Sequence, residues 1–159
     1  ADIKLSEEQR AVFYSDWTYS AIRQSVALPN ISTADEIAKY LDLPIEKVNA
    51  HLDFLLQTGL CKLMGKKIVV GSSSTHVDAS SPWVNVHHSN WRSRVIQSLT
   101  LSSESDLHYT SPLTLSASDC EVVREKIVQL IEDVGKVVDP SPSEKMYCLC
   151  LDWFQVKRS

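Results

Sequence analysis

Apolar residues recur at helical spacing in three stretches of the N-terminal half. Residues 6–27 carry the first of these stripes, which predicts one continuous helix. Thr33 and Glu36 have the spacing of a capping box and predict the start of a second helix. Pro44 suits the first position of a third helix, and Gly59 supplies the left-handed residue that ends it.

Two short runs of β-prone residues follow the third helix. They flank Gly65-Lys66 within residues 60–71, which is the pattern of a hairpin. The order helix, helix, tight turn, helix, hairpin is typical of a winged helix-turn-helix. We therefore predict such a module over residues 1–71, followed by a polar linker over residues 72–82.

The second half predicts a smaller part, residues 83–159, with the order helix, strand, helix, strand. Residues 83–99 have helical periodicity, and residues 107–115 alternate as a strand, although a proline within them indicates an edge or a break. A second capping box at residues 118–121 opens a long helix, and residues 146–156 alternate as a final strand. The predicted fold class is α+β.

Composition narrows the class of protein. The chain has 159 residues, 43% of them hydrophobic, which fits a globular protein. Its formal net charge of -4 argues against a protein that binds nucleic acid over its whole surface. No apolar run approaches the roughly 20 residues of a membrane span, and no signal peptide opens the chain. We expect a cytoplasmic protein with no membrane partner and with reduced thiols at Cys61, Cys120, Cys148 and Cys150.

The sequence shows no constellation of catalytic residues. Glycine-rich phosphate loops and nucleophile elbows are both missing from it. His87 and His88, with Cys148 and Cys150, offer a zinc site as one alternative. The other alternative is that the two cysteines are core residues that face the long helix from a strand. We favour the second and predict no catalytic, cofactor or metal residues, and hence not an enzyme.

The third predicted helix lies where a helix-turn-helix reads DNA. Asn49 and Gln57 suit contacts to adenine, and Lys47 suits guanine or phosphate, but Glu46 and Asp53 would repel the phosphate backbone. The module is thus a protein-interaction or dimerisation scaffold, or alternatively a direct reader of double-stranded DNA. The predicted contact residues for DNA or a partner are Lys47, Asn49, His51, Gln57, Lys62, Lys66 and Lys67.

Three stretches resemble a known family. They are Ser15-Asp16-Trp17 with Ala21-Ile22-Arg23, the segment from Glu36-Ile37-Ala38 to Gly59-Leu60, and Leu113-Thr114-Leu115-Ser116 with Met146-Tyr147-Cys148-Leu149 through Phe154. The chain resembles a paralogous family of uncharacterised bacterial proteins, abundant in Fibrobacter and Bdellovibrio-type lineages. Its members are described as conserved hypothetical proteins or transcriptional regulators, and they carry a C-terminal domain of unknown function. Gln155 departs from the proline that is usual there.

The resemblance implies a regulator and supplies no catalytic residues. Members of the family are longer at the N-terminus, with a helical segment that resembles a DNA-binding helix-turn-helix. We therefore predict the C-terminal region of a bacterial transcriptional regulator, acting in dimerisation, protein interaction or sensing. The alternative is direct binding of double-stranded DNA through the third helix and the wing. We expect a homodimer that pairs through the edge of residues 146–156, with DNA or a regulatory protein as a further partner.

Overall fold

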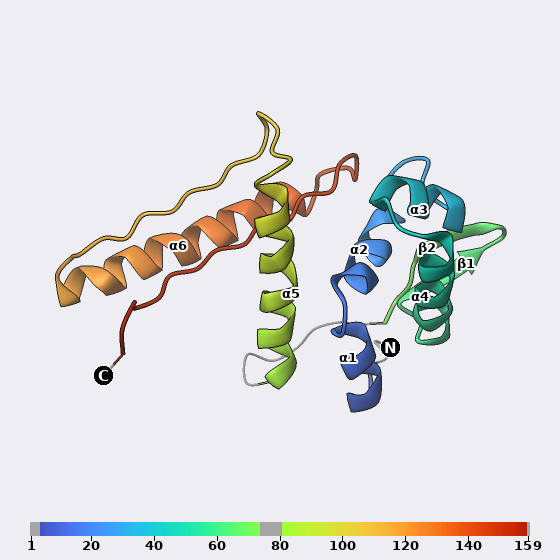
Figure 1. Cartoon of the computed structure of the whole chain (residues 1–159), viewed down its shortest axis with the longest axis horizontal. Helices are drawn as coiled ribbons and strands as arrows, with labels where there is room; N and C mark the ends of the chain where they lie inside the picture. Colours follow the sequence, from blue (N-terminus) through green and yellow to red (C-terminus); the bar gives the residue numbers. More distant parts are fainter. Residues whose placement is uncertain (1–3, 74–80, 159) are drawn as a thin grey trace. The chain divides into compact units, whose positions relative to one another are not determined.

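The computed structural model describes residues 4–73 and 81–158 (Figure 1). These residues form an α+β fold of six helices and one two-stranded antiparallel sheet. The elements are α1 (Glu7–Phe13), α2 (Trp17–Ser25), α3 (Ala34–Leu41), α4 (Ile45–Gln57), β1 (Cys61–Met64), β2 (Lys67–Val70), α5 (Pro82–Ser98) and α6 (Ala117–Val138). Among the described residues, no helix combines the length and the apolar character that crossing a bilayer requires.

Contacts divide the chain into two units. The first unit comprises residues 1–100 with 143–148, and the second unit comprises residues 101–142 with 149–159. Helix α5 therefore groups with the N-terminal helices. The predicted division at residues 72–82 stays a prediction, and residues 74–80 of that stretch lie outside the described residues.

The first predicted helix is wrong as a single element, because the chain breaks between α1 and α2. Asp16 has an extended backbone (φ -152°, ψ 140°), and its carboxylate accepts a hydrogen bond from the Thr18 backbone N–H at 3.1 Å. A carboxylate that satisfies the free N–H groups of a first turn starts a new helix. The apolar spacing continues across this break, which is why periodicity alone joined the two helices.

The next two helices begin and end close to the predicted positions. The Thr33 hydroxyl caps α3 by accepting from the Glu36 N–H at 3.2 Å, which confirms the predicted start. Asp42 ends α3 in the left-handed region at φ 53°. Pro44 has an extended ψ of 139° and precedes α4 as its N-cap, so the helix starts one residue later than predicted. Gly59 adopts the expected left-handed conformation, at φ 76°.

The predicted hairpin is confirmed. Strands β1 and β2 pair antiparallel, with Leu63 opposite Ile68, around a turn at Gly65 with φ 64°. The Ile68 N–H also donates to the Ser32 carbonyl at 2.8 Å, which ties the hairpin to the segment before α3.

Arg23 of α2 fixes the base of the hairpin. Its guanidinium donates to the carbonyls of Leu60 at 3.0 Å, Gly71 at 3.3 Å and Ser73 at 2.9 Å. These three carbonyls lie where the chain enters and leaves the hairpin. The Leu60 carbonyl also accepts from the Gly71 backbone N–H at 2.9 Å, so the guanidinium adds a second donor there and supplies donors to the carbonyls of Gly71 and Ser73.

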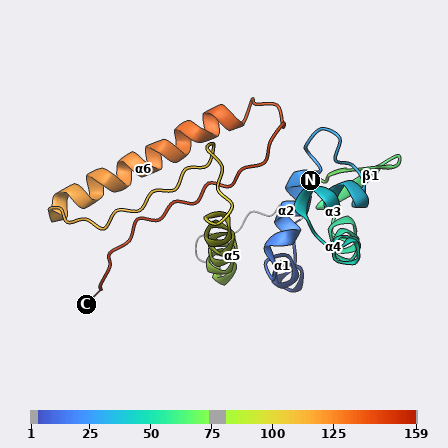
Figure 2. The ribbon, with the colours of Figure 1, turned by 45° about the horizontal axis from the view of Figure 1, so that its top comes forward.

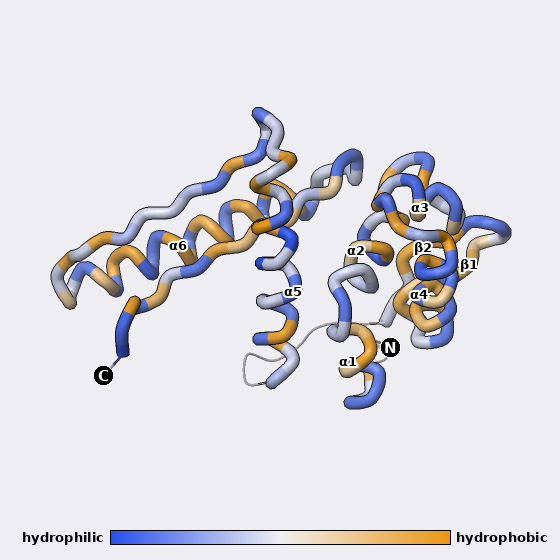
Figure 3. The backbone as a smooth tube through the Cα atoms, in the orientation of Figure 1, coloured by the Kyte–Doolittle hydropathy of each residue, from blue (hydrophilic) through white to orange (hydrophobic). Residues whose placement is uncertain are grey.

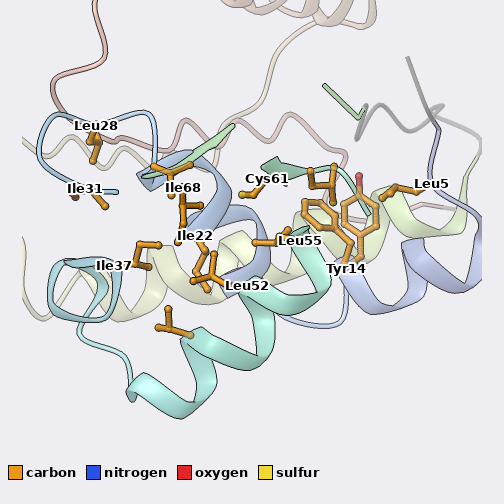
Figure 4. Close-up of a cluster of buried hydrophobic side chains, with 14 residues drawn as sticks. Leu5, Tyr14, Ile22, Leu28, Ile31, Ile37, Leu52, Leu55, Cys61 and Ile68 are labelled. Atoms are coloured by element: carbon orange, nitrogen blue, oxygen red, sulfur yellow. The ribbon is translucent and has the colours of Figure 1, made fainter. Parts of the chain in front are cut away.

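One hydrophobic core holds the first unit together, and Figure 4 shows its side chains converging from the helices and the hairpin. Ile22, Ile37, Val48 and Leu55 are fully buried at its centre. Trp83 and Val86 of α5 pack against it. The complete set of buried cluster residues is Leu5, Phe13, Tyr14, Ile22, Val26, Leu28, Ile31, Ile37, Val48, Leu52, Leu55, Leu60, Cys61 and Ile68.

The second unit has one helix between two extended segments. Helix α6 is capped by Ser116, whose hydroxyl accepts from the Asp119 N–H at 3.2 Å, so the helix begins at Ala117, ahead of the predicted capping box. The two views in Figures 1 and 2 show the extended segments running alongside α6.

Both predicted strands of the second half are wrong. Residues 107–115 and 146–156 are extended in conformation but contain no β-strand in the structure. A strand needs a neighbouring strand to complete its hydrogen-bonded ladder, and an alternating pattern specifies only the conformation and not the neighbour. The predicted helix-strand-helix-strand order is thus corrected to helix, extended segment, helix, extended segment. Cys148, expected in a core, is exposed, and Cys150 is half-buried.

Candidate interaction surface

Helix α4 has two sharply different faces. Val48, Leu52 and Leu55 are buried in the core at the spacing of one helical stripe. The exposed positions of α4, all of whose residues are described, are Glu46, Asn49, Ala50, Asp53 and Gln57. This exposed face carries two carboxylates and no cationic side chain.

Lys47, a predicted contact residue, is tied to α2. Its Nζ lies 2.9 Å from Oδ2 of Asp16, and both side chains are partly shielded from solvent, with exposed fractions of 39% and 28%. Burial alone would raise the pKa of the Asp16 carboxyl. The hydrogen bonds from Thr18 and the Lys47 ammonium outweigh that effect and hold this pKa below its usual value. The positive charge of Lys47 is therefore largely compensated within the fold by the Asp16 carboxylate.

His51, a second predicted contact residue, is also held against α2. Its Nδ1 lies 2.9 Å from the Thr18 hydroxyl, and its ring stacks on the Tyr19 ring with centroids 3.9 Å apart and planes inclined by 13°. Burial lowers the pKa of His51, and the nearby Asp16 carboxylate opposes part of this shift. His51 thus packs as a neutral aromatic ring between α2 and α4.

The hairpin presents the remaining predicted cations. Lys62, Lys66 and Lys67 are exposed, and in the part of the chain that the structure describes none of them forms an ion pair. The same hairpin exposes Leu63 and Met64, at 60% and 63% of their surfaces. Its surface therefore combines basic and apolar side chains.

A second aromatic contact joins α2 to α5. The rings of Trp17 and Trp91 meet edge to face with centroids 6.1 Å apart, and the Arg94 guanidinium lies 4.0 Å from the centroid of the Trp17 ring. The Asn90 amide donates to the Tyr14 carbonyl at 2.7 Å. These contacts fix α5 beside the break between α1 and α2.

The two adjacent histidines of α5 differ, because His87 is half-buried and His88 is exposed. His87 meets the Tyr14 ring edge to face at 5.5 Å, and burial lowers the pKa of His87. Among the described residues, no group of three or more His, Cys, Asp or Glu side chains is placed to hold a metal ion. Burial also raises the pKa of the Cys61 thiol to about 11, so this cysteine is protonated at neutral pH.

The predicted contact residues thus fall into three groups. Lys47 and His51 converge on α2, Asn49 and Gln57 lie on the exposed face of α4, and the three lysines lie on the hairpin. Sequence reasoning missed the role of Asp16, which caps α2 and pairs with Lys47. The available signal was an Asp immediately before an apolar helical run, which is a common N-cap.

The fold defines an α+β protein of helices and one hairpin, with α6 in a second unit. Within that class, the chain belongs to the family described as Domain of unknown function (DUF4423), whose model matches residues 1–156. The predicted domain of unknown function is therefore confirmed. No curated protein and no solved structure matches the chain.

Proposed function

We propose that this chain is the C-terminal, regulatory region of a bacterial transcriptional regulator and that it acts as a dimerising protein-interaction module. The order and pairing of α3, α4, β1 and β2 support a winged helix-turn-helix used as a scaffold. In this proposal the chain is not an enzyme, and it needs no cofactor.

The observation that carries the proposal is the exposed face of α4. In a helix-turn-helix that reads DNA, this face enters the major groove and meets the flanking phosphates. Here it presents Glu46 and Asp53, and the nearby Lys47 is paired with Asp16. Two carboxylates without a free cation oppose binding to a polyanion and suit a protein partner.

Direct binding of double-stranded DNA is the second candidate function. The specific observation in its favour is the hairpin, where Lys62, Lys66 and Lys67 project without ionic partners among the described residues. A wing of this kind contacts phosphates beside the recognition helix. The exposed Leu63 and Met64 on the same hairpin favour a protein surface instead.

Fluorescence anisotropy with mixed duplex DNA at low and at moderate salt separates the two functions. We expect no binding at low salt from a sample that light scattering shows to be a dimer. Binding that weakens steeply with salt and is lost in Lys66→Glu/Lys67→Glu would overturn the proposal. Lys136→Glu/Lys157→Glu is the matched control, because it makes the same change of charge at two exposed lysines of the second unit, outside the helix-turn-helix.

A further inference from the structure

The second unit lacks a core of its own. None of its described residues, 101–142 and 149–158, is buried. All the buried hydrophobic residues of the described chain lie between Leu5 and Ile68, in the first unit. A folded unit of about this size normally buries roughly 60% of the surface that its unfolded chain exposes. The second unit therefore lacks a packing layer.

Helix α6 carries a continuous apolar face that is only partly covered. Residues at the spacing of a coiled-coil seam, alternately three and four apart, are Cys120, Val123, Ile127, Leu130, Val134 and Val137. Val123, Ile127 and Val134 are half-buried, whereas Leu130 is 47% exposed and Val137 is 71% exposed. Figure 3 shows the apolar turns repeating along the length of α6. The face is thus covered along its middle and open at its margins.

The segment before α6 is open as well. Its apolar side chains fall at alternate positions, with Leu107 91%, Tyr109 85%, Leu113 53% and Leu115 38% exposed. Within the described residues, the backbone of 107–115 makes no backbone–backbone hydrogen bond. An extended segment with an apolar face and open backbone groups is a template for pairing with another strand.

The charges along α6 suit a second copy of the same helix. Placed antiparallel across the seam, two copies bring Lys126 of each opposite Asp133 of the other. Placed parallel, they bring Asp119 opposite Arg124. All four side chains are exposed, so they are available for such pairs. Either orientation joins opposite charges beside an apolar seam, which is the arrangement of a self-complementary interface.

We propose that a second copy of this chain docks on the second unit, covering the open apolar face of α6 and pairing with the extended segment 107–115. The inference rests on the proposed dimerisation and adds the surface that carries it. It replaces the expectation that residues 146–156 supply the pairing edge. A sheet or helix with one apolar face must bury that face against another layer, and two copies supply this layer to each other.

Sedimentation velocity of the full chain over a wide range of concentration tests the surface. Ile131 follows Ile127 by one helical turn and lies at the open edge of the apolar face, where it is 51% exposed. Ile131→Glu places a carboxylate at this edge and should raise the dimer dissociation constant by about tenfold or more. The matched control is Val122→Glu. Val122 is 46% exposed on the same helix, but nine residues at about 100° each place it on the opposite side. We expect the control to dimerise like the wild type.

Three outcomes separate this inference from the proposed function. A wild-type dimer that Ile131→Glu leaves intact overturns the surface while dimerisation stands. A wild type that stays monomeric at every concentration overturns the second copy as the occupant. Fluorescence anisotropy with duplex DNA then tests the second candidate function, direct DNA binding. Equal weakening by Ile131→Glu and Val122→Glu also overturns the surface, because the effect would not depend on the face.

A charge swap tests the interface without disturbing the apolar face. In an antiparallel pair, Lys126→Asp alone should weaken the dimer, and Lys126→Asp/Asp133→Lys should restore it. In a parallel pair, Arg124→Asp alone should weaken the dimer instead, and Asp119→Arg/Arg124→Asp should restore it. Failure of both swaps to show loss and recovery would contradict self-complementary pairing through α6.

Discussion

The two units of this chain have similar local sequence features and very different packing. In the first unit, the amphipathic helices α2, α3 and α4 bury their apolar stripes against one another and the hairpin. In the second unit, α6 has an apolar face of the same kind, with no buried residue. The difference shows that an amphipathic pattern states what a helix must bury and leaves open which chain provides the partner.

The largest expected effect comes from the core of the first unit. Leu55→Ala removes a fully buried side chain and should lower the free energy of unfolding by about 3 kcal/mol at any protein concentration. Leu130 in α6 is 47% exposed. Leu130→Ala should therefore lower the free energy of unfolding only at protein concentrations at which the dimer forms. Chemical denaturation at low and high concentration measures both. Equal, concentration-independent losses would remove the contrast between the units.

A smaller loss is expected from the donors at the base of the hairpin. Arg23→Met keeps much of the side-chain volume but removes the guanidinium donor from the carbonyls of Gly71 and Ser73, and the second donor from the carbonyl of Leu60. We expect a destabilisation of about 2 kcal/mol, because partly buried carbonyls would lose hydrogen bonds. Thermal unfolding followed by circular dichroism measures it, with Arg158→Met at an exposed position outside the proposed interface as the control. Matching losses in the two variants would argue against the Arg23 contacts.

Helix caps should behave alike in both units, because a cap acts within one turn of the chain. Thr33→Ala at α3 and Ser116→Ala at α6 each remove a hydroxyl that accepts from a backbone N–H, both at 3.2 Å. Each should lower the stability of its own helix by about 1 kcal/mol. Residue-specific amide exchange reports each helix separately. A loss at only one of the two helices would show that the caps are not equivalent.

The smallest effect expected is a pH dependence confined to the first unit. Burial lowers the pKa of His51 in the fold below its ordinary value of 6.5, so the unfolded chain binds its proton more readily. The stability linked to neutral His51 is therefore complete above about pH 6.5 and is lost as the pH falls through the folded pKa. Denaturation across this range, with and without His51→Gln, isolates the contribution. An unchanged slope in the variant would exclude His51 as its source.

Local chemistry made much of the first unit predictable. The Thr33 cap, the left-handed Gly59 and the turn at Gly65 each act within a few residues, and each was predicted from the sequence. The break at Asp16 was missed because the apolar period runs through it, and only the cap interrupts the helix. Its ion pair with Lys47 could not be predicted, since it depends on how α2 crosses α4.

The second unit shows where such reasoning ends. The helix α6 was predicted because its period is intrinsic to the sequence. The strands at residues 107–115 and 146–156 were wrongly predicted because a strand requires a pairing partner. The interaction face of α6 was also missed, because burial by other parts of the chain cannot be read from an apolar stripe alone.

Amide hydrogen exchange of the full chain at low and high protein concentration tests the central claim most directly. We expect the amides of α6 to exchange more slowly at high concentration, as a second copy covers the helix, while the amides of α4 exchange at the same rate at both concentrations. Exchange in α6 that is independent of concentration, in a sample that remains monomeric, would contradict the account.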